Sequence, residues 1–245
     1  MIYKLGQHRI ALGDSTDEDV VKKLMGKEKI NLILTDPPYG VDYVAGKKGF
    51  ANHLQSDWED IENDELQTDE QYVAFTERWL ELAKAHIAPY NSFYIFNSDM
   101  MFHALRRGIT RADFYPSQML IWVKSNVVLG RKDYLPQHEL ISYGWHKRHK
   151  FYRSKGKSLI YHPKQHKSKL HPTQKPVGLI RKLMDNSSKP GDVVYEPFLG
   201  GGSTLIASEH LKRRCYAIEM SEKYVDTTIR RWEKLTKQKA EKLST

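Results

Sequence analysis

The chain has 245 residues, 40% of them hydrophobic, with a formal net charge of +9 and a single cysteine. This length fits one α/β domain, residues 1–245, with a sizeable core. No apolar run is long enough to span a membrane and the first residues lack a signal peptide's apolar region, so we expect a cytoplasmic protein without a membrane partner. One cysteine, Cys215, excludes an internal disulfide, and no His/Cys cluster has the spacing of a zinc site.

Strand and helix patterns alternate along the chain. Strands are expected at 1–12 (as a strand or hairpin), 30–34, 91–96, 119–123, 139–143, 192–196 and 214–219. Helices are expected at 16–25, 68–87, 100–107, 177–185, from about 203, and after Ser221, which can cap the last of them. This alternation is typical of an α/β protein.

Residues 36–39 place a carboxylate, two prolines and an exposed aromatic ring at the end of the apolar strand 30–34; they are Asp36, Pro37, Pro38 and Tyr39. Open α/β sheets bind their ligands at the carboxyl ends of strands. Each proline removes an amide donor and fixes a φ angle, so the loop is stiff and its carbonyls remain free acceptors. Rigid acceptors beside a flat ring suit the exocyclic amino group of a planar heterocycle. The alternative is a strand end followed by a proline turn.

Positive charge is concentrated between residues 140 and 184, a stretch that contains no Asp or Glu. Its cations are Lys147, Arg148, Lys150, Arg153, Lys155, Lys157, Lys164, Lys167, Lys169, Lys175, Arg181 and Lys182. Aromatic residues, among them Trp145 and Tyr152, are interleaved with them, which suits a nucleic-acid backbone with some reach toward the bases. The alternative is a solvated basic loop. The histidines of this stretch alternate with Lys and Arg, so we assign them to the basic surface and not to a metal site.

A glycine-rich turn at 198–204 follows the predicted strand 192–196. Its spacing is Phe198-x-Gly200-x-Gly202, which lets the backbone approach a ligand closely but differs from the pyrophosphate pattern Gly-x-Gly-x-x-Gly. The next strand ends with Glu219, and an acid at that position commonly binds ribose hydroxyls. The alternatives are a tight turn without a ligand and, for Glu219, a surface carboxylate or a helix-cap partner.

Taken in order, these motifs resemble those of S-adenosylmethionine-dependent DNA amino-methyltransferases. The resemblance is to the permuted group, because the Asp-Pro-Pro-Tyr motif precedes the glycine motif. Residues 171–176, His-Pro-Thr-Gln-Lys-Pro, match another family motif, and residues 121–124 and 134–139 resemble the family's middle section. The chain departs from the family at Glu196, where Asp is usual, and at 199–202, where Ala-Gly-Ser-Gly is common. The resemblance implies a Rossmann-like methyltransferase fold with a mostly parallel, doubly wound sheet, an antiparallel edge and circularly permuted motif order.

The same resemblance implies a site for S-adenosylmethionine and its product S-adenosylhomocysteine, without a metal. Phe198, Gly200 and Gly202 would shape the pocket for the methionine part, and Glu219 would hold the ribose hydroxyls. Asp14 matches a family motif near the adenine ring of the cofactor, although Asp14 alone could equally cap the following helix. The other residues expected at the cofactor are Asp36, His171, Thr173, Lys175, Glu196 and Ser203.

Methyl transfer from a sulfonium to an aromatic amine needs no nucleophilic side chain, but the amine is a poor nucleophile. Asp36 and the Pro37 carbonyl would accept hydrogen bonds from the two amino hydrogens and favour a pyramidal nitrogen. A base within a duplex must be flipped out to reach such a site, and stacking on Tyr39 would be worth roughly 1–3 kcal/mol. Within the family, Asp at the first motif position favours adenine N6. Cytosine N4 is the alternative, and a non-catalytic DNA-binding subunit of the same fold is a further one.

Double-stranded DNA is therefore the expected partner. The residues expected to contact it are Lys47, Lys48, Arg131, Lys147, Arg148, Lys150, Arg153 and Lys155. Residues 145–170 form a short basic insertion that we interpret as the DNA-recognition segment, and residues 41–70 as a mobile loop that closes over the flipped base. Because the recognition segment is short, a homodimer would lengthen the contact with a duplex. A cognate restriction endonuclease is the other candidate partner.

Overall fold

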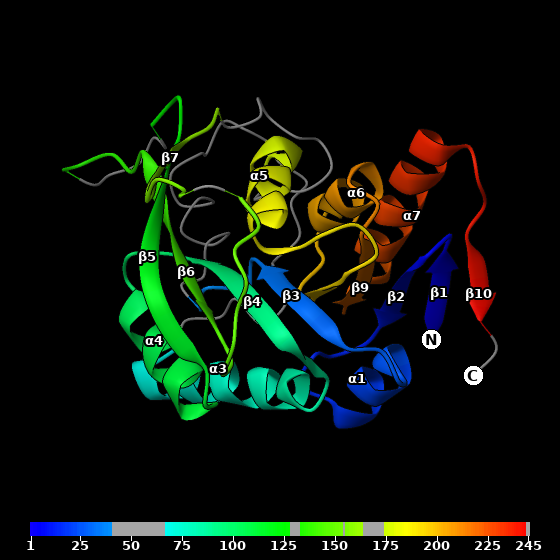
Figure 1. Cartoon of the computed structure of the whole chain (residues 1–245), viewed down its shortest axis with the longest axis horizontal. Helices are drawn as coiled ribbons and strands as arrows, with labels where there is room; N and C mark the ends of the chain where they lie inside the picture. Colours follow the sequence, from blue (N-terminus) through cyan, green and yellow to red (C-terminus); the bar gives the residue numbers. More distant parts are fainter. Residues whose placement is uncertain (41–66, 128–132, 154, 164–173, 244–245) are drawn as a thin grey trace, which may run out of the picture.

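The computed structural model describes residues 1–40, 67–127, 133–153, 155–163 and 174–243. Its strands are β1 (Ile2–Leu5), β2 (His8–Leu12), β3 (Ile30–Thr35), β4 (Ile87–Asn97), β5 (Tyr115–Val123), β6 (His138–Trp145), β7 (Leu159–Tyr161), β8 (Val193–Glu196), β9 (Arg214–Glu219) and β10 (Glu241–Leu243). Its helices are α1 (Glu18–Met25), α3 (Asp69–Lys84), α4 (Phe102–Arg111), α5 (Val177–Ser187), α6 (Ser203–His210) and α7 (Glu222–Thr236) (Figure 1). None of the helices in these ranges combines the length and apolar character needed to cross a membrane.

All described strands belong to one sheet, in the order β10-β1-β2-β9-β8-β3-β4-β6-β5-β7. The strands from β2 to β4 run parallel, while β6 is antiparallel to both β4 and β5. From β8 the chain moves outward to β9, and from β3 it moves outward to β4 in the opposite direction. The β8/β3 boundary is therefore the topological switch point, where doubly wound sheets bind ligands outside the carboxyl ends of their strands.

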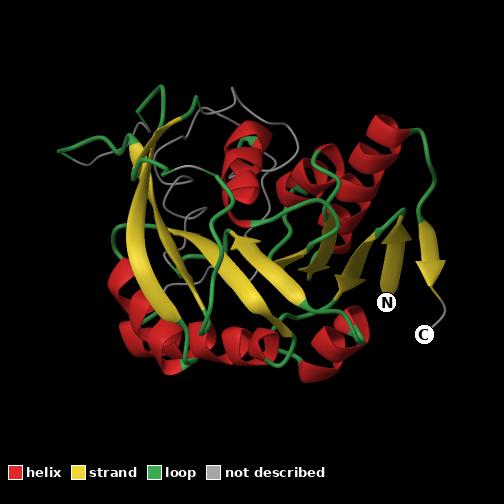
Figure 2. Ribbon diagram, viewed as in Figure 1, coloured by secondary structure: helices red, strands yellow, loops and turns green. Residues whose placement is uncertain are grey.

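Helices cover both faces of the sheet (Figure 2). One face packs against α1, α3 and α4, with Leu24, Trp79 and Leu105 fully buried in a shared cluster. The other face packs against α5, α6 and α7 through Leu183, Leu205 and their neighbours. Because the central strands are covered on both sides, β8 is buried along its whole length and nearly all of β3 is buried. This is the doubly wound, mostly parallel sheet with an antiparallel edge that the resemblance implies.

The helix starts show how local sequence sets element boundaries. A capping box fixes the start of α3: the backbone N–H of Gln71 donates to Thr68 Oγ1, and that of Thr68 donates to Gln71 Oε1. Asp17 caps α1 and accepts a hydrogen bond from the backbone N–H of Asp19 at 2.8 Å, so the alternative role of Asp14 as the cap of this helix is wrong. Ser221 precedes α7 as expected, but its side chain makes no capping hydrogen bond.

The sequence patterns did not predict β7 or β10, two strands of only three residues. Strand β10 pairs antiparallel with β1, so the last described residues extend the same edge as the first strand (Figure 1). Strand β7 pairs parallel with β5 and extends the opposite edge. Three residues are too few for a periodic pattern to distinguish a strand from a loop, so pairing with a neighbour decides these segments.

Candidate active site

The carboxyl ends of four neighbouring parallel strands bring the predicted motifs together. Asp14 follows β2, Glu219 ends β9, the glycine turn follows β8, and Asp36 follows β3. Backbone hydrogen bonds connect adjacent ends: the N–H of Gly13 donates to the Glu219 carbonyl, and the N–H of Leu199 donates to the Ile218 carbonyl, both at 3.0 Å. Segments far apart in the sequence thus form one continuous row at this edge.

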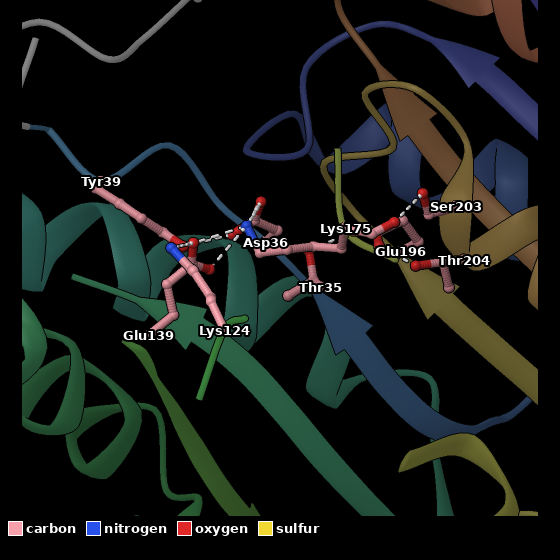
Figure 3. A network of polar contacts seen from close by, with 9 residues as sticks. All are labelled: Thr35, Asp36, Tyr39, Lys124, Glu139, Lys175, Glu196, Ser203 and Thr204. Atoms are coloured by element: carbon pink, nitrogen blue, oxygen red, sulfur yellow. Dashed lines mark hydrogen bonds and ion pairs between the residues drawn. The ribbon is translucent and has the colours of Figure 1, made fainter. Parts of the chain in front are cut away.

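Asp36 lies in a cluster of charged side chains that it shares with Lys175, Glu139 and Lys124 (Figure 3). The Lys175 ammonium donates to Asp36 Oδ2 and lies 3.2 Å from Glu139 Oε2. The other oxygen of Glu139 is 2.6 Å from Lys124 Nζ. The two lysine side chains are only 7% and 5% exposed, whereas the Asp36 side chain is 21% exposed. We call these four side chains the charge cluster.

Burial and mutual attraction set the protonation of the charge cluster. Burial raises the pKa of Asp36, an effect that the Lys175 ammonium opposes and the Glu139 carboxylate reinforces. Burial disfavours the charged form of Lys175 as well, but the two carboxylates outweigh it and hold the lysine pKa above its usual value. For Glu139, burial is likewise outweighed by the two ammonium groups, which hold its pKa below the usual range. The cluster therefore keeps a charged Lys175 beside an Asp36 carboxyl group that is less acidic than an exposed aspartate.

Tyr39 is half-buried in the structure, in contrast to the exposed ring that the sequence predicts. Its hydroxyl donates to Asp36 Oδ1 at 2.6 Å, so both oxygens of Asp36 have donors. Burial, together with the Asp36 charge, raises the tyrosine pKa well above its usual value, which keeps the hydroxyl neutral and able to donate. A ligand amino group at Asp36 Oδ1 would share this oxygen with the hydroxyl or take its place, because a carboxylate oxygen can accept two hydrogen bonds.

Glu196, at the end of β8, lies beside Thr35, which precedes the Asp-Pro-Pro-Tyr motif, and is only 3% exposed. Thr204 donates to its Oε2 at 2.7 Å, while Thr35 and the backbone N–H of Phe198 donate to its Oε1. Burial raises the pKa of Glu196 to about 8, although these donors favour the charged form. The carboxyl thus connects β3, β8 and α6 at the switch point.

The glycine turn has the backbone geometry that its sequence requires. Gly200 and Gly202 have φ angles of 50° and 77°, in the left-handed region where side chains are strained. A Cβ added at Gly202 would lie 2.5 Å from the Thr228 hydroxyl. Phe198 packs against Phe75 and Trp79 of α3, with ring centroids 5.6 Å apart in both pairs. These contacts fix the turn between the sheet and the helices on both faces.

The predicted cofactor residues beside this turn are also brought together. The Glu219 carboxylate accepts hydrogen bonds from the backbone N–H groups of Gly200, at 2.7 Å, and Ser221, at 2.9 Å. Ser203 donates to the Lys175 carbonyl at 2.7 Å, so the lysine contacts Asp36 through its side chain and α6 through its backbone. Glycine backbone beside several carboxylates suits a cofactor that carries cationic groups and ribose hydroxyls.

Several predicted residues lie outside the part of the chain that the structure describes. They are Lys47, Lys48, Arg131, His171 and Thr173, with most of the predicted loop 41–70 and residues 154 and 164–170 of the predicted recognition segment. In the described ranges, no group of three or more His, Cys, Asp or Glu side chains is arranged to hold a metal ion.

The described basic residues after β6 are not brought to the edge where Asp36 lies. Because β6 is antiparallel to β4, its end at Trp145 reaches the amino-terminal side of the parallel strands. There the Arg148 carbonyl accepts a hydrogen bond from the backbone N–H of Asn91, and Arg153 pairs with Asp185 at 3.4 Å. Lys147 and Lys150 are exposed on the same side. The chain then crosses to β7, so only the part after Lys155 approaches the edge that carries Asp36.

Four further residues of this site were not predicted as site residues: Thr35, Thr204, and Lys124 and Glu139, which belong to the segments that resemble the family's middle section. Thr35 and Lys124 lie at the ends of β3 and β5, whereas Glu139 and Thr204 lie at the starts of β6 and α6, and all four positions are at the carboxyl edge. Lys124 directly follows the apolar strand 119–123. Because a lysine is rarely buried without a partner, its position was a usable signal of a paired charge. Its partner could not be identified from the sequence, since Lys124 and Glu139 meet only through the β5/β6 pairing.

A family profile described as "DNA methylase" matches residues 30–230. The type II methyltransferase M.HinfI of Haemophilus influenzae is 29% identical, over 87% of this chain and 66% of that protein. M.HpaI of Haemophilus parainfluenzae is 25% identical, over 83% and 68%. The chain thus spans about two thirds of the length of these relatives.

Two solved structures share the fold. The M1.HpyAVI–SAM complex superposes with a TM-score of 0.66 at 22% identity, over 91% of this chain and 98% of that one. The cytosine-N4-specific PvuII DNA methyltransferase superposes with a TM-score of 0.70 at 18% identity, over 93% and 89%. Both similarities concern the backbone architecture, since the sequence identities are low.

Proposed function

Because the chain belongs to the DNA methylase family of amino-methyltransferases, we propose that it transfers a methyl group from S-adenosylmethionine to N6 of an adenine flipped out of duplex DNA. The observation that carries this proposal is the position of Asp36. It lies at the carboxyl end of β3, beside the glycine turn of β8, at the switch point of the sheet. There a carboxylate for the amine is next to a turn suited to the cofactor.

We propose that the cofactor lies along the row of strand ends from β2 to β3. The glycine turn would face the methionine part, Glu219 the ribose hydroxyls and Asp14 the adenine end. Lys175, Glu196 and Ser203 would support these groups from behind, since each is nearly buried. The bound cofactor supplies an activated methyl group as a sulfonium.

For the amine, Asp36 and the Pro37 carbonyl would accept the two amino hydrogens and turn the nitrogen lone pair toward the methyl group. The increase in the rate of methyl transfer would come from preorganised acceptors and from the positioning of the amine. Pro38 keeps the loop stiff, and the Tyr39 ring would stack on the flipped base after its hydroxyl leaves Asp36. The hydrogen bond that now joins Tyr39 to Asp36 would thus be exchanged for contacts with the base.

Adenine is favoured over cytosine by the aspartate at the first position of the motif. Cytosine N4 remains the second candidate, supported by the fold similarity to the cytosine-N4-specific PvuII enzyme. A non-catalytic DNA-binding subunit is disfavoured because Asp36, Tyr39 and the glycine turn are all present, and each is hydrogen-bonded to another predicted site residue.

We propose duplex DNA as the partner at the carboxyl edge, with the segment after Lys155 and the predicted loop 41–70 on either side of the flipped base. The first part of the segment 145–170, including Lys147, Arg148, Lys150 and Arg153, would contact only DNA that extends beyond this edge. A homodimer would lengthen the contact, and a cognate restriction endonuclease would give the modification a protective role.

The test is product analysis with wild type and two variants, Asp36→Ala and Asp36→Asn. Each protein is incubated with unmethylated duplex DNA and S-adenosylmethionine, and the DNA is digested to nucleosides and identified by mass spectrometry. We expect methyladenine from wild type and a rate lower by at least about 10²–10³-fold in both variants, since a preorganised acceptor is lost. Cofactor binding, followed by calorimetry, should be retained in both.

Other outcomes are equally informative. Methylcytosine would preserve the mechanism and overturn the base assignment. Undiminished turnover in Asp36→Ala would contradict the role of Asp36, and cofactor binding without methylation of any DNA would favour the non-catalytic alternative.

A further inference from the structure

The charge cluster contains two members that lie outside the Asp-Pro-Pro-Tyr motif and the glycine turn, Glu139 on β6 and Lys124 after β5 (Figure 3). Glu139 contacts both lysines, at 2.6 Å from Lys124 Nζ and 3.2 Å from Lys175 Nζ. Its side chain is 19% exposed, and its Oε2 has no hydrogen bond of good geometry, only the ion pair with Lys175. Glu139 is therefore committed to the lysines and not to a structural backbone contact at that oxygen.

The cluster balances two carboxylates against two ammonium groups. Removing one member would leave an uncompensated charge in a largely buried site, which is unfavourable. The arrangement is also asymmetric, since Lys175 lies between the two carboxylates while Lys124 contacts Glu139. Lys175 thus shares its positive charge between Asp36 and Glu139.

The shared charge of Lys175 matters for the proposed reaction. The amine lone pair forms the new N–C bond, the electron pair of the S–C bond returns to sulfur, and one proton leaves the nitrogen for water by way of the Asp36 carboxylate. Positive charge therefore develops at the nitrogen, beside Asp36. An uncompensated Lys175 ammonium at the same carboxylate would oppose that charge, because like charges repel strongly where water is excluded.

We propose that Glu139 is a positioning residue for methyl transfer: it holds and neutralises the Lys175 ammonium, so that the negative charge of Asp36 remains available to the reacting amine. Lys124 holds Glu139 in place from the other side. This inference rests on the proposed function and extends it to a residue that acts on Asp36 through Lys175. It predicts an effect on the chemical step and not on the binding of either substrate.

Glu139 and Lys175 shift the pKa of Asp36 in opposite directions. The ionisable groups that interact with Asp36 are Lys175, Glu139, Tyr39 and Glu196. Behind them, Lys124 acts on Glu139 and Tyr72 acts on Tyr39. The Glu139 charge opposes ionisation of Asp36, whereas the Lys175 charge favours it. Neutralising Glu139 should therefore lower the pKa of Asp36, and neutralising Lys175 should raise it.

The experiment measures kcat and KM against pH for wild type, Glu139→Gln and Lys175→Gln, with DNA and S-adenosylmethionine varied in turn. For Glu139→Gln we expect kcat to fall roughly 10- to 100-fold, as for other misplaced catalytic groups, with little change in either KM. The acid limb of its kcat profile should move to lower pH, and that of Lys175→Gln to higher pH.

Glu209→Gln is the matched control for the loss of a paired carboxylate. Glu209 lies on α6, where it is 3.0 Å from His8 Nε2 and accepts a hydrogen bond from Trp232 Nε1 at 2.7 Å. This variant should lower Tm but leave kcat and the acid limb unchanged. If Glu139→Gln does not fold, the variant Lys124→Gln/Glu139→Gln removes one charge of each sign and should shift the acid limb in the same direction.

A folded Glu139→Gln protein with wild-type kcat would overturn the inference. A lower kcat with an unmoved acid limb would also overturn it, because that result indicates only a packing role. Absence of methylation by wild type would instead contradict the proposed function itself, so the two failures are distinguishable.

Discussion

The two edges of the central sheet carry charge in opposite ways. At the carboxyl edge, Asp36, Lys175, Glu139 and Lys124 are largely buried and paired within a few ångströms. At the amino edge, the segment 146–153 presents exposed cations, and Arg153 forms a surface pair with Asp185. The side chains of the charge cluster are thus confined by burial, whereas the cations of the segment 146–153 are exposed to solvent.

The comparison indicates that burial, and not the number of charges, decides how much a charged residue contributes to the free energy of unfolding. A buried pair is sensitive to the loss of one partner, because the other is left without compensation. An exposed pair contributes little, because water and salt screen it. The same substitution at the two edges should therefore change the free energy of unfolding by very different amounts.

The largest expected effect comes from replacing a lysine at each edge by methionine. Lys175→Met leaves the Asp36 and Glu139 carboxylates without their shared cation, so we expect a loss of about 3–5 kcal/mol in the free energy of unfolding. Lys150→Met is the matched control. The Lys150 ammonium lies 5.3 Å from the centre of the Tyr152 ring, so its loss should lower the free energy of unfolding by at most about 1 kcal/mol. Urea denaturation of both variants measures the difference. Equal losses would contradict the comparison.

The next effect concerns the hydrogen bond that the flipped base would replace. Tyr39→Ala removes the proposed stacking ring, and we expect it to weaken binding of target-containing DNA by roughly 1–3 kcal/mol. Tyr39→Phe keeps the ring and removes only the hydrogen bond to Asp36. It should therefore bind such DNA at least as well as wild type. Fluorescence anisotropy with matched duplexes tests both; equal weakening in the two variants would exclude a stacking role.

Glu196 should make stability depend on pH. Its pKa is raised to about 8 in the folded protein, above the usual 4.5, so the folded state binds the extra proton between these values. Stability from this group is therefore fully present below about pH 4.5 and is lost as pH rises through 8. Because glutamine does not titrate, the free energy of unfolding of Glu196→Gln should fall less steeply with pH than that of wild type, by up to about 1.4 kcal/mol per pH unit. Denaturation at pH 6 and pH 8 measures it; identical pH slopes would contradict a raised pKa.

The smallest effect is expected from the exposed cations at the amino edge. Because Lys147, Arg148 and Lys150 lie away from Asp36, the triple change to glutamine should alter DNA affinity and its salt dependence only slightly. Lys155→Gln/Lys157→Gln, nearer the carboxyl edge, should reduce the slope of log affinity against log salt by about 0.9 for each phosphate that is no longer neutralised. Titrations at several salt concentrations compare the two. A larger effect of the triple variant would place the duplex along the amino edge.

Much of the fold could be predicted from local patterns. The apolar run 30–34, the glycine turn and the capped helix starting at Asp69 all form where the sequence predicts them, because each depends on neighbouring residues. The cap of α1 was the exception, since Asp14 and Asp17 are equally suitable by type and only the backbone path selects between them. Strands β7 and β10 were missed because their pairing partners lie far away in the sequence.

The sequence by itself determined the motifs, their order and the family they resemble, because residue types, spacing and turn chemistry are local properties. Only the tertiary structure decided which charges meet. Lys175 comes next to Asp36 across 139 positions of the chain, and Glu139 joins them through strand pairing. The same packing separated Lys147 and Arg148 from that site, because an antiparallel strand ends at the opposite edge of the sheet. Distance along a chain does not set distance in space, and the free energy of a charge depends on the latter.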